Sequence, residues 1–131
     1  MKGLKFKVIV AFFLVLWCSG GLVANAEEEE LSPKAFIMRA WEAWGAKDFE
    51  KTFYYTERCI ERYSEKAKEE QAFLEAFPST EVMELYEALN AVGTSFFIQG
   101  EAFLSQGKTD EAITVFKTVI EEYGYAQNWD P

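Results

Sequence analysis

Residues 96–124, FFIQGEAFLSQGKTDEAITVFKTVIEEYG, decide the fold of this chain. Apolar residues recur at helical spacing on both sides of a break at Gln106–Gly107, which predicts two helices joined by a tight turn. Small residues at Gly100 and Ala112 let two such helices approach closely, and Phe103 and Phe116 fill the space beside that contact. The stretch therefore predicts a close-packed helix–turn–helix unit.

The spacing of these residues is also that of a known helical repeat. The pattern Phe96-x2-Gln99-Gly100-x2-Phe103, followed by Ala112-x3-Phe116 and Gly124, resembles the tetratricopeptide repeat. The resemblance implies helix pairs that present a surface to a protein or peptide partner and that rarely do chemistry themselves. The string from Gly100 to Gln127 is similar to the repeats of exported bacterial cell-envelope factors, from the outer-membrane assembly and division-coordination families. The chain departs from the pattern at Arg39 and Gln99, where leucine is usual, and at Gly124, where proline is usual.

Two further helices are expected before this unit. Ser32 is placed to cap the first, with Pro33 at its first position, and residues 45–47 break it. Asp48 is placed to cap the second, whose apolar spacing continues to Leu74.

The third and fourth helices complete the predicted fold. Ser79 or Thr80 is expected to cap a third helix that carries apolar residues from Val82 to Phe103. Thr109 is expected to cap the fourth helix and Gly124 to end it. The fold class is therefore all-α, with four antiparallel helices arranged as two tetratricopeptide-like helix pairs.

The first helix pair reads as a weaker copy of the second. Aligning Asp48 with Lys108 and Thr52 with Ala112 separates the copies by 60 residues, whereas this repeat family uses about 34. If the additional residues between the copies are divided between the second and third helices, they predict a long central helical hairpin around Lys66 to Ala88. The alternative is a degenerate middle repeat.

The N-terminus is expected to be a targeting segment. A basic head, the apolar run Val8–Trp17 and the small-residue site Ala24–Ala26 predict a secretory signal peptide over residues 1–26. The apolar run is too short for a membrane anchor, which needs about 20 residues. A lipoprotein signal that uses Cys18 is disfavoured by the bulky Trp17. We therefore expect an exported protein, periplasmic or secreted, with no stable membrane span after cleavage.

The remaining chain is expected to consist of an acidic leader, residues 27–31, and the helical domain, residues 32–131. After Ala26 it carries all 22 acidic residues and 10 of the 13 basic ones, a formal charge of −12. This charge disfavours nucleic acid and anionic lipid as partners. Cys59 is the one cysteine left, and its apolar neighbours favour a core residue over a nucleophile.

Catalysis is not expected. The chain has no histidine, which excludes Ser-His-Asp and Cys-His arrangements and His-ligated zinc sites, and no cofactor or metal is expected. A carboxylate pair such as Glu42 with Glu101, acting on a glycosidic bond, is the remaining enzymatic hypothesis. The abundance of carboxylates gives that pair no preference over others.

The resemblance places partner binding on the first helix of each pair. Carried over by position, the partner-binding residues are Lys34, Ile37, Trp41, Trp44, Thr94, Phe97, Glu101 and Leu104. Trp41 and Trp44 share one stripe and could clamp a peptide side chain or an apolar ligand, or they could be core residues that pack against the hairpin or a preceding element.

The expected function is that of an exported adaptor that binds a protein or peptide partner. The alternative is a self-associating structural module of the cell envelope. The aromatic tail, residues 125–131 with Trp129, is expected either to fold back over the fourth helix or to pair with a second copy as a homodimer.

Overall fold

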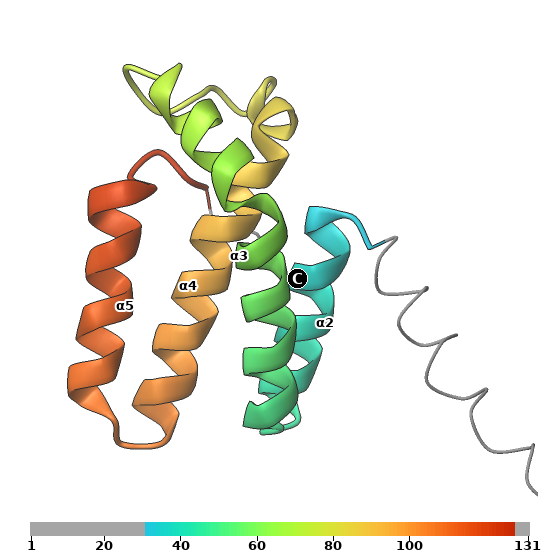
Figure 1. Ribbon diagram of the computed structural model, residues 1–131, viewed down its shortest axis with the longest axis vertical. Coiled ribbons are helices and arrows are strands. Elements are labelled where there is room, and N and C mark those ends of the chain that lie inside the picture. Colours follow the sequence, from blue (N-terminus) through green and yellow to red (C-terminus); the bar gives the residue numbers. More distant parts are fainter. Residues whose placement is uncertain (1–30, 128–131) are drawn as a thin grey trace, which may run out of the picture. The chain divides into compact units, whose positions relative to one another are not determined.

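The computed structural model describes residues 31–127, and these form an all-α fold (Figure 1). The elements are α2 (Pro33–Gly45), α3 (Phe49–Ala72), a 3-10 helix η1 (Met83–Tyr86), α4 (Glu87–Ser105) and α5 (Thr109–Glu122). This confirms the predicted fold class. The predicted signal peptide, the leader residues 27–30 and Trp129 lie outside the described residues.

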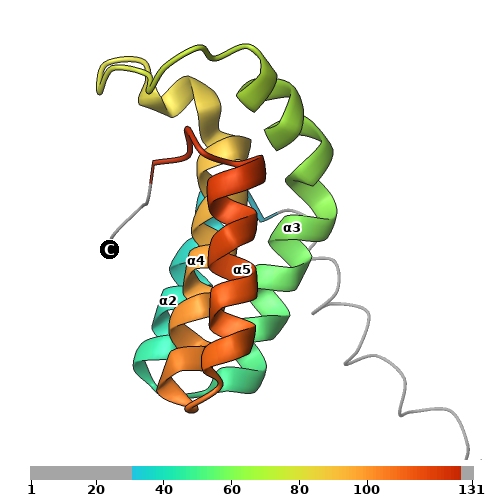
Figure 2. The same ribbon diagram turned by 90° about the vertical axis from the view of Figure 1, so that its left-hand side faces the viewer.

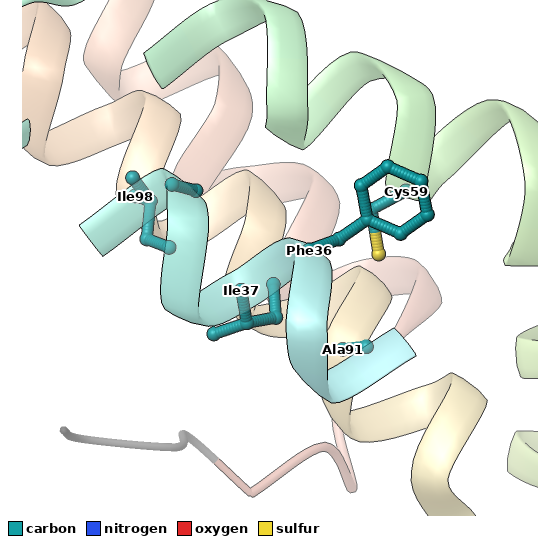
Figure 3. Packing of buried hydrophobic residues seen from close by; sticks show 6 residues of the cluster. Phe36, Ile37, Cys59, Ala91 and Ile98 are labelled. Atoms are coloured by element: carbon teal, nitrogen blue, oxygen red, sulfur yellow. The ribbon is translucent and has the colours of Figure 1, made fainter. Parts of the chain in front are cut away.

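Helix α4 is the central element of this part of the chain. It packs against α2, α3 and α5, and most of its residues are buried (Figures 1 and 2). One apolar cluster joins α2 to α3 and α4, with Phe36, Ile37, Cys59, Ala91 and Ile98 seen together in Figure 3. A second cluster contains Ala67, Ala88, Leu89, Val92 and Tyr123. Among the described helices, none is both long and apolar enough to cross a membrane.

The two helix pairs share the same turn, which supports the alignment of Asp48 with Lys108. Lys47 and Gly107, 60 residues apart, are the two described residues with positive φ, at 57° and 73°. The backbone N–H of Asp48 donates to the carbonyl of Ala43, and that of Lys108 donates to the carbonyl of Phe103, both at 2.9 Å. The pairs α2–α3 and α4–α5 are therefore two copies of one unit.

The helix starts follow the prediction only in the first copy. Ser32 accepts a hydrogen bond from the Ala35 N–H at 3.2 Å, and Asp48 accepts one from the Lys51 N–H at 3.1 Å. The prediction for Thr109 is wrong: it is the first residue inside α5, and the cap position is held by Lys108, whose side chain makes no cap hydrogen bond.

The cap predicted for the third helix is also wrong. Neither Ser79 nor Thr80 stands directly before α4, because residues 73–82 form an irregular connection and η1 lies between this connection and α4. Pro78 restricts its neighbours and lacks an N–H, which opposes a continuous helix here. The carboxylate of Glu70, on α3, instead accepts a hydrogen bond from the Leu89 N–H at 2.8 Å in the first turn of α4.

The central hairpin is present with one difference from the prediction. Its ascending arm is helical, since α3 has 24 residues. The returning arm is the irregular connection followed by η1 and the first turn of α4, so Val82 and Leu85 are exposed rather than packed on a helix face.

The described part of the C-terminal tail folds back onto this hairpin rather than over α5. The Tyr125 hydroxyl donates to the Glu75 carbonyl at 2.9 Å, and the Gln127 amide donates to the Pro78 carbonyl at 2.7 Å. Ala126 lies so close to Gly93 that a Cβ on that glycine would overlap it. The tail therefore holds the connection between the two helix pairs.

Candidate partner-binding face

Aromatic side chains form a row across α2, α4 and α5. The ring centroids of Trp44 and Trp41 are 5.5 Å apart, and those of Trp41 and Phe97 are 6.3 Å apart, both with edge-to-face geometry. Phe97 continues the row to Phe116 on α5 at 5.8 Å. Such pairs contribute about 0.5–1.5 kcal/mol each beyond the area that they bury, so the row is a firm surface.

The two tryptophans are neither fully buried nor fully exposed, and their role in partner binding stays a prediction. Trp41 and Trp44 pack against the first apolar cluster, yet each keeps part of its surface accessible. They lie at positions three apart on α2, the spacing that puts two side chains on one helix face. The core therefore fixes their position, and the accessible edges are available to a partner.

Two of the predicted partner-binding residues do not belong to the surface. Ile37 and Thr94 are each 1% exposed, so their prediction as contact residues is wrong for this conformation. They are covered because α2 and α4 pack directly against each other. Sequence position alone placed them on the helix face but did not show how closely the neighbouring helix approaches.

The other six predicted residues reach the surface, and we call them the α2/α4 face. Lys34 and Leu104 are exposed, whereas Glu101 and the three aromatic side chains are partly exposed. The face comprises Lys34, Trp41, Trp44, Phe97, Glu101 and Leu104. It offers apolar contact area together with one positive and one negative charge.

Phe116 is a supporting residue that sequence reasoning assigned only to packing. Its ring lies against Gly100, where a Cβ would overlap it, and it also contacts Phe97. Because Gly100 has no side chain, the Phe116 ring of α5 can pack beside α4 and support Phe97. The repeat pattern contained both residues, but it did not connect them to the face.

The indole N–H of Trp44 is an unusual feature of the face. This nitrogen is buried and has no hydrogen-bond partner within residues 31–127. An unpaired buried donor costs about 1–3 kcal/mol.

A buried polar pair explains one departure from the repeat pattern. The Gln99 amide donates to the Thr56 hydroxyl at 3.0 Å, and that hydroxyl donates to the Thr52 carbonyl at 2.9 Å. Glutamine can therefore replace leucine at this core position, because its amide is satisfied by α3. Arg39, its counterpart in the first copy, is exposed, since α2 has no described helix on that side.

Cys59 has the properties of a core residue. It is fully buried, and burial raises the pKa of its thiol from 9.0 to about 11, although the Ser95 hydroxyl opposes this shift. A thiol with a raised pKa is a poor nucleophile at neutral pH.

Glu42 is exposed and Glu101 is partly exposed, and their role as a carboxylate pair stays a prediction. Within the described range, no group of three histidine, cysteine or acidic residues could hold a metal ion.

One comparison with known protein families gives a match, and this match lies in the second helix pair. Residues 94–124, which span most of α4 and all of α5, match the family model of the tetratricopeptide repeat. No curated protein and no solved structure matches the chain. The match supports a helical repeat module of the kind that mediates protein–protein interaction, and proteins of this family are typically non-enzymatic scaffolds.

Proposed function

We propose that this chain is a non-enzymatic exported adaptor that binds a protein or peptide partner on the α2/α4 face. The observation that carries the proposal is the aromatic row Trp44–Trp41–Phe97, with centroid separations of 5.5 and 6.3 Å. Partly exposed tryptophans on a rigid support are the residues that most often dominate a protein–protein interface.

The mechanism is burial of apolar partner side chains against the three aromatic rings. Lys34 and Glu101 carry opposite charges, so they favour one orientation of a charged segment. A partner that turned the Trp44 ring on binding could accept its N–H with a backbone carbonyl, since this buried N–H has no hydrogen-bond partner within residues 31–127.

Export follows from the predicted signal peptide, and the acidic remainder of the chain fits this proposal. Mass spectrometry of the protein isolated from the extracytoplasmic fraction of its host would test it. A chain that begins at Glu27 is expected, and a cytoplasmic chain that retains Met1 would refute export.

A photo-crosslinker at Leu104 tests partner binding on the α2/α4 face. A benzoylphenylalanine at this exposed position is expected to give a discrete adduct in the native host, and Trp41→Ala should abolish it. The matched control is the same photo-crosslinker at Glu111, an exposed residue of α5. An adduct of equal yield at Glu111, or one that survives Trp41→Ala, would contradict the proposed face.

A second candidate function, self-association, is supported by the outer side of α5. Ile113 and Ile120 are 47% and 74% exposed. Their counterparts in the first copy, Phe53 and Ile60, pack toward α4. The ring centroids of Phe53 and Phe103 are 4.8 Å apart, and Ile60 packs against the second apolar cluster. Light scattering at several concentrations tests this alternative. A dimer that Ile120→Glu dissociates would support it, and a concentration-independent monomer would exclude it.

A further inference from the structure

The turn between the two helix pairs exposes an unusual amount of apolar surface. Phe73, at the end of α3, and Leu85, in η1, are 83% and 73% exposed, and Phe77 between them is 64% exposed. Val82 is exposed as well. We call these four residues the tip patch. Soluble domains rarely leave several large apolar side chains of one short segment in water unless the surface binds something.

The backbone of the tip patch is held in place by contacts from elsewhere in the chain. The Phe77 ring lies 5.5 Å from the Tyr125 ring, edge to face, and the tail also bonds the carbonyls of Glu75 and Pro78. Asn90 donates to the Met83 carbonyl at 3.0 Å. The exposed side chains therefore project from a fixed support, which lowers the entropy cost of binding.

The electrostatic surroundings of the tip patch are of one sign. No lysine or arginine occurs between Lys68 and Lys108, and the same stretch contains seven glutamates. Glu75, Glu81 and Glu84 are exposed among the apolar residues of the tip. A hydrogen bond with Ser79 lowers the pKa of Glu81, which keeps that carboxylate ionised.

The two lysines nearest in sequence are already engaged with acidic residues. The Lys66 ammonium nitrogen lies 3.8 Å from a carboxylate oxygen of Glu70, and that of Lys68 lies 2.8 Å from a carboxylate oxygen of Glu122. They compensate those carboxylates rather than the three glutamates of the tip. A ligand of the tip patch would meet apolar side chains surrounded by negative charge.

We propose that the tip patch is a docking surface for a partner segment that combines apolar side chains with lysine or arginine. The apolar part would cover Phe73, Phe77 and Leu85, and the basic residues would pair with Glu75, Glu81 and Glu84. A second copy of this chain would bring the same three glutamates into opposition, and an anionic membrane would be repelled by them. Charge therefore selects a basic protein segment over both.

This surface is distinct from the α2/α4 face. Trp44 lies just before α3 begins and Phe73 just after it ends, and α3 has 24 residues. At 1.5 Å per residue, Trp44 and Phe73 are separated by about 36 Å along that helix. One partner could occupy each surface, and failure of one proposal leaves the other intact.

The test uses fluorescence anisotropy of a labelled synthetic peptide with the full 131-residue chain. The peptide is a helix-forming sequence with leucine at i, i+3, i+4 and i+7 and with lysine at the flanking positions. Its counterpart carries glutamate in place of each lysine. Vesicles of phosphatidylcholine, with and without phosphatidylglycerol, are measured in parallel, together with the mass of the chain in solution.

Two sets of variants carry the test, each with a matched control. Phe73→Ser and Leu85→Ser remove apolar tip residues, and Met38→Ser removes an exposed apolar residue of α2. The triple variant of the tip glutamates to glutamine is matched by Glu50→Gln, Glu57→Gln and Glu65→Gln on α3, which changes the net charge equally.

Binding of the basic peptide is expected to weaken about tenfold in each tip variant and to change less than about twofold in each control, since few residues of an interface dominate its affinity. The acidic peptide should not bind. The proposal is overturned if the basic peptide does not bind, if the control variants weaken binding as much, or if the acidic peptide binds equally well. Tip-dependent binding of vesicles would indicate a membrane surface instead, and a tip-dependent dimer would indicate a second copy.

Discussion

Substitution of Gly100 by alanine separates packing from helix propensity within one helix. Gly100 lies inside α4, where alanine would favour the helix by about 0.5–1 kcal/mol. A Cβ at this position, however, would overlap the Phe116 ring. Overpacking of this kind costs about 1–3 kcal/mol. Taken at their midpoints, the two effects predict for Gly100→Ala a net loss of about 1 kcal/mol in the free energy of unfolding.

The measurement is urea and thermal unfolding followed by circular dichroism. A loss of this size should lower the Tm by about 4–8 °C, the shift that 1 kcal/mol produces in a domain of this size. The matched control is Gly45→Ala at the end of α2, where an added Cβ has no neighbour within 4 Å. Gly45→Ala should leave stability unchanged or raise it by less than about 1 kcal/mol.

A double substitution identifies the cause. If the overlap with Phe116 is responsible, Phe116→Leu should cost less in the Gly100→Ala background than in the unchanged chain, a non-additive effect of about 0.5–3 kcal/mol. The reasoning is refuted if Gly100→Ala is as stable as the unchanged chain, or if the two substitutions are additive.

Three other predictions concern polar and titratable groups. Glu70→Ala should lower the free energy of unfolding by about 1–3 kcal/mol in urea, because the Leu89 N–H loses its acceptor. The control Glu69→Ala, at an exposed neighbour, should have little effect. Equal losses would contradict the role of Glu70 at the start of α4. Thr56→Val should destabilise the chain more than Gln99→Leu in urea unfolding, since only Thr56→Val leaves the buried Gln99 amide without its acceptor. The reverse order would exclude this explanation. The pKa of the Cys59 thiol is raised from 9.0 to about 11, so its neutral form stabilises the fold below about pH 9, and this contribution is lost as the pH rises toward 11. Unfolding of the unchanged chain should therefore depend more steeply on pH in this window than that of Cys59→Ala, and iodoacetamide should modify Cys59 only after denaturation; rapid modification of the native chain would contradict this.

Local signals were sufficient to predict most of the fold. Ser32 and Asp48 act within three residues of their own positions, so their caps could be read from the sequence. Helical periodicity and the alignment of Asp48 with Lys108 predicted the two helix pairs and their offset, and the positive φ of Lys47 and Gly107 in the structure agrees with that alignment. The start of α4 was missed because its partner, Glu70, lies 19 residues earlier in the chain.

The candidate face was predicted only in part, for a similar reason. Trp41 and Phe97 were placed on one surface by the repeat register, and the structure brings their rings together. Ile37 and Thr94 were misplaced because their burial depends on how closely α2 approaches α4, which is a tertiary property. The tip patch could not be predicted either, since the apolar residues around Val82 read as one side of a helix.

The contacts of residues 125–127 also constrain the order in which the chain can acquire its structure during synthesis. The connection at Glu75 and Pro78 is fixed by Tyr125 and Gln127, which a ribosome adds about 50 residues later. At about 5–20 residues per second, this interval lasts several seconds. Phe73 and Phe77 leave the ribosome before residues 125–127 do, so they emerge while the contacts that order their backbone do not yet exist. The nascent chain therefore presents an apolar, unstructured segment that a chaperone could recognise before the finished protein presents it to a partner.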